Sequence, residues 1–251
     1  MADPEEMEEI PMSAVKEFLL TFMPEKCYDQ FFLHFNFAHV PCLRIVLSKC
    51  MGLWIMVGSV FALLPQIWKV LRAGSADGLS LTSTILSLYS ASGYVAYCIS
   101  QGFPIGAWGE SLFILTQVIL LNFLILHYSG QTVRALLFLM LYCAVMYVLT
   151  SALVPQKAIA VVQDSGVLAI IASRLIQAGS NYLSKHTGQL STASVILVFI
   201  GALAHIFVSL QETGQSLSSL TQVLACLCSG VLVFQMFHYG KAPLPAKEKS
   251  E

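Results

Sequence analysis

The chain has 251 residues, of which 57% are hydrophobic and 11% are charged. A water-soluble domain carries about 25% charged residues, so most of this surface is not suited to water. The formal net charge of −1 argues against nucleic acid as a partner. The composition predicts an all-α membrane protein, because a backbone in lipid must satisfy its own hydrogen bonds.

Residues 1–46 precede the first long apolar stretch and mix aromatic with charged residues. This pattern predicts interfacial helices on the membrane surface. We expect no cleavable signal peptide, because the start is acidic and the apolar run 18–23 is too short. Cys27 and Cys42 lie here and could face an oxidising lumen. Two free thiols are the favoured interpretation and a disulfide is the alternative, since nothing in the sequence sets their distance.

Seven apolar stretches follow, each close to the roughly 20 residues that a spanning helix needs. We expect transmembrane helices at 48–71, 79–100, 107–127, 133–154, 165–183, 190–210 and 217–239. Asp164, Arg174, Gln177 and Asn181 weaken the fifth as a span.

Basic residues indicate the orientation, because cytoplasmic loops are enriched in lysine and arginine. With seven spans, the loops after the first, third and fifth share a side with the C-terminus. That side holds Lys69, Arg72, Arg134, Lys185, Lys241, Lys247 and Lys249. The other side has Lys16, Lys26, Arg44, Lys49 and Lys157. We expect a lumenal N-terminus and a cytosolic C-terminus.

An internal repeat appears when the chain is shifted by 111 residues, the separation of Gln66 and Gln177 (177 − 66). The same shift matches a polar turn followed by Leu-Ser at 79–80 with another at 190–191. Chance similarity between leucine-rich helices is the alternative, but the matches share one register without gaps. We therefore predict a duplication.

Two three-helix units joined directly would insert with opposite orientations, and one extra helix between them makes them parallel, as in some transporters. The predicted architecture is two parallel three-helix repeats joined by a linker helix. Its parts are a lumenal interfacial segment at 1–46, a first repeat at 47–128, a linker at 129–156, a second repeat at 157–240 and a cytosolic tail at 241–251.

Leu64-Pro65-Gln66 in the first span resembles the motif of the PQ-loop family. Within that family, the sequence resembles the branch that serves dolichol-linked sugars. The matching stretches are PEKCYDQ at 24–30, HVPC at 39–42, LPQ at 64–66, GLSL at 78–81, WGE at 108–110, GQTV at 130–133, HTGQLS at 186–191 and QETG at 211–214. The second repeat has Ile176-Gln177 instead of Pro-Gln, and His205 stands where an arginine is expected in relatives.

The resemblance implies a protein of the endoplasmic reticulum membrane. It implies a role in the use of dolichol-phosphate mannose and dolichol-phosphate glucose as lumenal donors for N-glycan precursors, GPI anchors and related glycosylation. Membrane lipid, the dolichol-phosphate sugars and glycosyltransferases of the same membrane are the expected partners. The chain is not expected to be an enzyme or to need a cofactor.

The final residues include Lys247 and Lys249, fifth and third from the end. They resemble a dilysine-type retrieval signal that cytosolic coat proteins read, and that reading requires a cytosolic tail. A solvated charged tail is the alternative.

Pro65 lacks a backbone donor, so we expect it to kink the first span. The kink is interpreted as a hinge that gates access or as a static bend. Intramembrane polar residues usually face a cavity or a partner. Arg174, Gln177 and Asn181 fall on one helical face, which Glu110, Gln117 and Gln66 could oppose.

That polar face is the candidate ligand site, with a structural network between helices as the alternative for each single member. An anionic lipid-linked sugar would need a cation, and Arg174, Lys69 and Arg72 could supply it. The ordinary basic girdle of a membrane protein is the alternative for Lys69 and Arg72.

No catalytic or metal-binding constellation is recognised in the sequence. The leading hypothesis is a facilitator that presents or reorients a dolichol-linked sugar. A small-solute transporter is the runner-up, and a membrane glycosyltransferase or its subunit is the third. A polar route through the bundle would favour a solute, whereas a lateral slot would favour a lipid.

Overall fold

The computed structural model describes residues 16–17, 19–20, 23–105, 108–151, 153–212 and 217–239, and these form helices without a strand. The predicted all-α class is confirmed for this part of the chain. The elements are α2 (Glu25–Tyr28), the π-helix η1 (Asp29–Leu33), α3 (Val40–Phe61), α4 (Leu64–Ala73), α5 (Leu81–Ser100), α6 (Gly109–Tyr128), α7 (Thr132–Thr150), α8 (Gln156–Ser184), α9 (Thr192–Glu212) and α10 (Leu217–Tyr239).

Five segments are long and apolar enough to cross a membrane by length and composition: Val40–Ala73, Gly109–Tyr128, Thr132–Thr150, Gln156–Ser184 and Gln222–Tyr239. The helices α5 and α9 occupy the predicted segments 79–100 and 190–210 but are not among the five. The helix α9 contains a shorter apolar stretch, Thr192–Phe207. The protein is a membrane protein with several candidate spans, and the seven crossings stay a prediction.

Two helices begin earlier than predicted. The first span was expected at 48, but α3 begins at Val40, so residues 40–46 form the first turns of the same long helix. Pro41 lies in its first turn, where a missing N–H costs nothing. Similarly, α8 begins at Gln156, after Pro155, where 165 was expected. Arg44, Lys49 and Asp164 interrupt the hydropathy of these regions without interrupting their helices.

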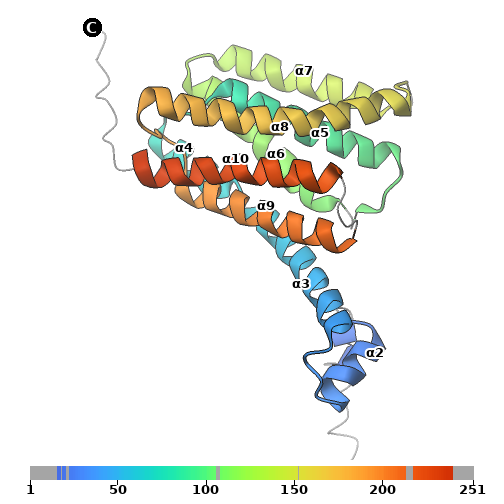
Figure 1. The fold of residues 1–251 in the computed structure, drawn as a ribbon. Coiled ribbons are helices and arrows are strands. Elements are labelled where there is room, and N and C mark those ends of the chain that lie inside the picture. The colour runs from blue at the N-terminus through green and yellow to red at the C-terminus, as the bar shows by residue number, and fades with distance from the viewer. Residues whose placement is uncertain are drawn as a thin grey trace, which may run out of the picture.

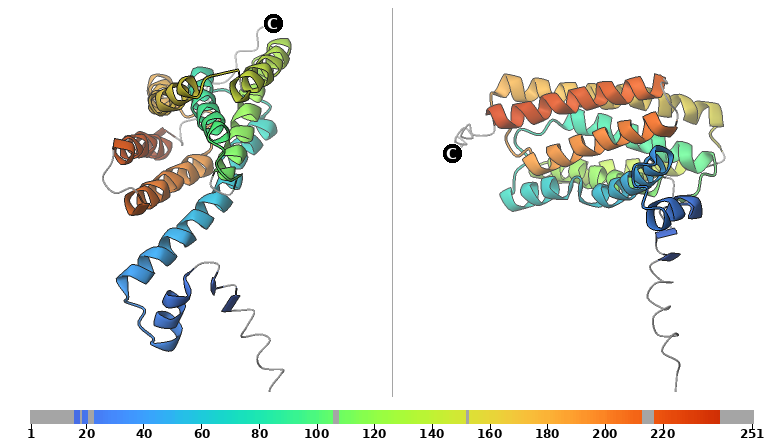
Figure 2. Two further views of the ribbon diagram at one scale, coloured as in Figure 1. Left: turned by 90° about the vertical axis from the view of Figure 1, so that its right-hand side faces the viewer. Right: turned by 60° about the horizontal axis from the view of Figure 1, so that its bottom comes forward.

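The helices of the main bundle run side by side, and α3 leaves the bundle toward α2 (Figure 1). In the first half, α6 packs against both α3 and α5. In the second half, α10 packs against both α8 and α9. The halves meet where α5 runs along α8 and α3 crosses α9, and α7 covers α5 and α6 (Figure 2). A shift of 111 residues relates α3–α4 to α8, α5 to α9 and α6 to α10, so equivalent helices make equivalent contacts.

The contact between α5 and α8 depends on small residues. A Cβ on Gly166 would lie 3.2 Å from the Cα of Ser90, and one on Gly93 would lie 3.2 Å from the carbonyl oxygen of Val162. Small residues allow helices to approach closely in a membrane, where helices gain little from hydrophobic burial. This approach brings the polar side chains of the two halves within hydrogen-bonding distance.

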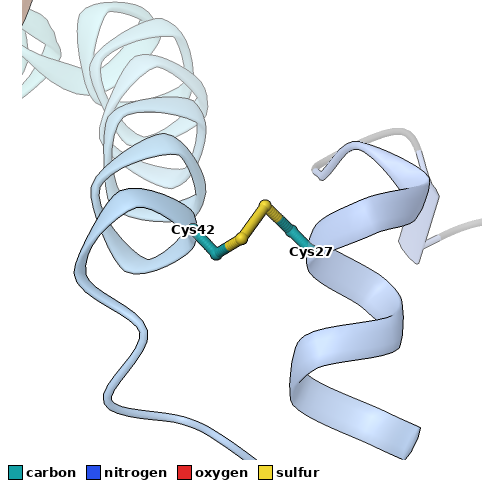
Figure 3. The surroundings of a disulfide bond; sticks show 2 residues. All are labelled: Cys27 and Cys42. Atoms are coloured by element: carbon teal, nitrogen blue, oxygen red, sulfur yellow. A yellow bond between two sulfur atoms is a disulfide. The ribbon is translucent and has the colours of Figure 1, made fainter. Parts of the chain in front are cut away.

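A disulfide joins Cys27 and Cys42, and Figure 3 shows it linking α2 to the first turn of α3. The favoured interpretation of two free thiols was wrong. The sequence contains no measure of their distance, but the loop between η1 and α3 turns the chain back and leaves the two Cα atoms 5.2 Å apart. That distance lies within the usual range for a disulfide.

Candidate functional site

Gln66 lies on α4 and is buried, with both ends of its amide bonded to the turn before α9. Its Nε2 donates to the carbonyl of Gln189 at 2.8 Å, and its Oε1 accepts from the backbone N–H of Ser191 at 2.6 Å. The backbone N–H of Gln66 donates to the hydroxyl of Ser194 at 2.9 Å. These bonds join the first half of the chain to the second.

Gln177 lies on α8 and makes the corresponding bonds to the turn before α5. Its Oε1 accepts from the backbone N–H of Ser80 at 3.0 Å, and its Nε2 donates to the carbonyl of Gly78 at 2.9 Å. Its Nε2 also donates to the Oδ1 of Asn181 at 3.0 Å. Each glutamine therefore binds the polar turn of the other half.

The partners of the two glutamines obey the same offset as the glutamines themselves. Gly78 and Gln189 are 111 residues apart (189 − 78), and so are Ser80 and Ser191 (191 − 80). Both serines also cap the helix that follows, accepting from the N–H three residues later. The prediction that Gln66 and Gln177 occupy equivalent surroundings is confirmed. We call these two glutamines and the turns 77–80 and 188–191 the glutamine network.

The two turns also contact each other directly. The N–H of Gln189 donates to the carbonyl of Asp77 at 2.8 Å. Gly78 and Gly188 have φ of +84° and +51°, and a Cβ on Gly78 would lie 2.8 Å from the Cα of Gly188. Glycine is needed on both sides because side chains would separate the turns.

Lys69 lies at the same end of the molecule as the glutamine network. Its ammonium donates to the carbonyls of Gly188 at 3.3 Å and of Leu190 at 2.8 Å. It was predicted as a cation for a headgroup or as part of the basic girdle, and here it also satisfies carbonyls of the second turn. Arg72, its companion in that prediction, is exposed at the end of α4.

Asn181 extends the glutamine network toward α10. Its Nδ2 donates to the Oε1 of Gln235 at 3.0 Å, and the Nε2 of Gln235 donates to the carbonyl of Ala178 at 2.9 Å. Sequence reasoning missed Gln235, although a glutamine within an apolar span is itself a signal of an internal partner.

Gln117 lies elsewhere, at the break between α3 and α4. Its Oε1 accepts from the N–H of Leu63 at 2.8 Å, and its Nε2 donates to the carbonyl of Ser59 at 2.8 Å. A continuous helix would join that N–H to that carbonyl directly, so the amide of Gln117 replaces the missing bond. The predicted kink at Pro65 is confirmed as this interruption, two residues before the proline. The gating role of this break stays a prediction.

Glu110 lies in the first turn of α6 and faces α9. Its Oε1 is 3.9 Å from the Nε2 of His205, and both side chains keep some exposure. This contact again joins the two halves, far along α6 from the glutamine network.

Arg174 is separate from the other members of its predicted face. It lies on α8, partly buried, and no hydrogen bond or ion pair engages its guanidinium within the described part of the chain. The predicted site thus divides into a glutamine network, a helix break, a Glu110–His205 pair and an isolated arginine.

An open surface cavity of about 440 Å³ lies between α9 and α10. Its lining is apolar: Phe199, Leu203, Cys226, Leu227, Gly230, Val231 and Phe234. None of the predicted ligand residues contributes to it. A second cavity of about 320 Å³ along α7 is also apolar, lined by Ala144, Val145, Val148, Leu149 and Val154.

Within the described residues, no group of three or more histidine, cysteine, aspartate or glutamate side chains is placed to hold a metal ion. Three predicted features lie outside the described residues: the lysines of the predicted retrieval signal, Lys247 and Lys249, the acidic start of the chain, and part of the stretch 211–214.

Residues 47–107 match the family model of the PQ loop repeat. The match covers α4, α5 and most of α3, including Leu64-Pro65-Gln66 and the turn that Gln177 binds. The chain therefore contains a PQ-loop repeat in its first half, within a membrane protein built of helices.

Proposed function

We propose that this protein is a non-enzymatic membrane facilitator for the use of dolichol-phosphate mannose and dolichol-phosphate glucose in the endoplasmic reticulum. The PQ-loop repeat at 47–107 supports the family. The stretches PEKCYDQ and HTGQLS favour likeness to the mannose-P-dolichol utilization defect 1 protein. In this proposal seven helices cross the membrane as two parallel repeats, with the N-terminus lumenal and the C-terminal lysines read by coat proteins.

The apolar cavity between α9 and α10 is the observation that favours a lipid ligand over a small solute. Its lining has no charged residue, which suits a hydrocarbon chain and not a sugar. The polar side chains expected to line a route for a solute are instead bonded to backbone. Gln66, Gln117 and Gln177 each use both ends of the amide in this way, which leaves little hydrogen-bonding capacity for a ligand.

Arg174 is the cation proposed for the phosphate of such a lipid. An unpaired guanidinium within a helix bundle of a membrane protein costs about 3 kcal/mol or more, and a phosphate would offset that cost through a charge-assisted bidentate contact. Replacing Arg174 with alanine should reduce full-length lipid-linked oligosaccharides, and lysine should restore part of the effect. Unchanged oligosaccharides in Arg174→Ala would remove the phosphate site from the proposal.

The main experiment deletes the gene in cells and measures dolichol-phosphate mannose beside the lipid-linked oligosaccharides. We expect the donor to be made while the oligosaccharides stop short of full length. Normal oligosaccharides would refute the proposed function. A proteoliposome assay with labelled monosaccharide tests the runner-up, a small-solute transporter, which predicts uptake that depends on this protein.

The cavity is tested by filling it in the complemented cells. Leu227 lines it and is 62% exposed, whereas Leu168 on α8 is 69% exposed and lies outside it. We expect Leu227→Trp to shorten the oligosaccharides and the matched control Leu168→Trp to leave them full length. Equal behaviour of the two variants would show that the cavity does not hold the lipid chain.

A further inference from the structure

The N-terminal hairpin, defined as residues 23–42, has a core of its own. Met23, Cys27, Phe31 and Cys42 are buried together, and the disulfide lies within this group. The hairpin sits at the end of α3 that is far from the bundle (Figure 1), so its core does not depend on the other helices.

The tip of this hairpin turns large apolar side chains outward. The exposed fractions are 41% for Phe32, 65% for Leu33, 74% for Phe35, 58% for Phe37 and 64% for Val40. The rings support one another, with centroids 5.9 Å apart for Phe31 and Phe37 and 6.5 Å apart for Phe35 and Phe37. A compact, disulfide-closed hairpin thus presents an apolar tip that nothing in the described structure covers.

Phe35 is held in the left-handed region, with φ of +50°. A bulky residue rarely adopts this conformation, which costs on the order of 1 kcal/mol or more. The strain is not offset by burying the ring, because the ring is largely exposed. An outlier of this kind points to a function for the exposed ring.

The tip is continuous with the apolar surface of a candidate span. The helix α3 has 22 residues before the break, which at 1.5 Å per residue is about 33 Å long. The hydrocarbon core is about 30 Å thick, so the first turn of α3 reaches the level of the headgroups. Arg44 and Lys49 are exposed there among the exposed Leu43, Ile45 and Leu47, a mixture typical of the membrane interface.

We propose that the N-terminal hairpin is a membrane-surface anchor whose tip, Phe32 to Phe37, inserts between the headgroups and acyl chains of the bilayer beside the bundle. Phenylalanine and leucine are typical of the apolar face of an interfacial segment, and such a segment buries that face about 5–10 Å deep. Arg44 and Lys49 then meet lipid phosphates. The disulfide holds the tip in its inserted shape. This inference does not depend on which ligand the protein serves.

The test places a tryptophan at the tip of the full-length protein. Phe35→Trp is reconstituted into phosphatidylcholine vesicles with or without bromine on the upper acyl carbons, and its additional emission over the wild type is measured. Lys26→Trp is the matched control, because Lys26 is an exposed polar position on α2 of the same hairpin. Phe37→Trp serves as a second tip variant if Phe35→Trp does not form the disulfide.

We expect the added emission of Phe35→Trp to be blue-shifted, to be lost in brominated vesicles and to resist aqueous iodide. The added emission of Lys26→Trp should be quenched by iodide and should persist in brominated vesicles. If the tip tryptophan is quenched by iodide and not by bromine, the anchor is refuted. Shielding from both quenchers would also refute it, because the tip would then be covered by protein.

Discussion

At the scale of single residues, the two glutamines were expected to line a ligand site, and the structure assigns them to the junction of the two halves. A glutamine amide has a donor and an acceptor end, so it pairs with the N–H and C=O that a polar turn leaves free. Reading Gln66 and Gln177 as a matched pair was correct, but which groups they face was decided by the packing of α5 on α8 and of α3 on α9.

Replacing Gln177 with alanine should destabilise the protein. The backbone N–H of Ser80 and the carbonyl of Gly78 would lose their partner within a buried contact, at a cost of about 1–3 kcal/mol. Thermal unfolding of the detergent-solubilised protein measures the loss. Gln101→Ala is the control, because Gln101 is exposed at the end of α5. Equal melting temperatures for the two variants would contradict the network.

Gly188 tests the contact between the turns. Gly188 and Gly74 have similar positive φ, +51° and +59°, but only Gly188 would place a Cβ against the other turn, at Asp77. Gly188→Ala should therefore lower the melting temperature more than Gly74→Ala, since both carry the same backbone strain. If both alanines have the same effect, the turns do not depend on their close approach.

At the scale of elements, the break between α3 and α4 belongs to the first half alone. Its counterpart α8 is continuous, with Ile176 where the first half has Pro65. The 111-residue offset also pairs Gln117 with Cys228 (228 − 117). The second half therefore has no amide at the position of Gln117, and its continuous helix has no break for an amide to bridge. Pro65 and Gln117, which are 52 residues apart in the sequence (117 − 65), therefore act together at the break between α3 and α4.

A double-mutant cycle tests the coupling between Pro65 and Gln117. Gln117→Ala should cost about 1–3 kcal/mol of stability, because it leaves the Leu63 N–H without a partner at the break and removes a donor to the Ser59 carbonyl. The same change made on Pro65→Ala should cost less, since the helix can then close its own bond. Chemical or thermal unfolding of the four proteins gives the coupling energy. Additive effects would separate the glutamine from the proline.

Pro65→Ala also tests the hinge. If the break moves as a gate, this variant should lower the yield of full-length oligosaccharides in complemented cells while the protein remains folded and abundant. Full activity would identify the break as a static bend.

At the scale of the whole molecule, the N-terminal hairpin and the basic end of the bundle are suited to opposite sides of the membrane. A disulfide between Cys27 and Cys42 persists where the environment is oxidising, which agrees with the lumenal N-terminus predicted from the distribution of lysine and arginine. The chain has seven cysteines, and five of them are free in the structure.

Counting reactive thiols tests this compartment. Protein denatured without reductant should take up five maleimide–polyethylene glycol adducts, and reduction should raise the number to seven, as the free thiols and the total require. Cys27→Ser should take up six in both conditions, because it releases Cys42. Seven adducts on the wild type before reduction would mean that the hairpin lies in a reducing compartment or does not close.

The amino-acid sequence by itself determined the helical class, the pairing of Gln66 with Gln177 and the kink at Pro65, because these follow from hydropathy, from a register of identical residues and from a missing N–H. Only the tertiary structure decided that Cys27 meets Cys42, that Gln117 serves the kink, and that Arg174 stands apart from Gln177 and Asn181 although all three share a helical face. Spacing along one helix shows which side chains share a direction. What they meet depends on other helices, whose distance and rotation are set by packing across the whole bundle.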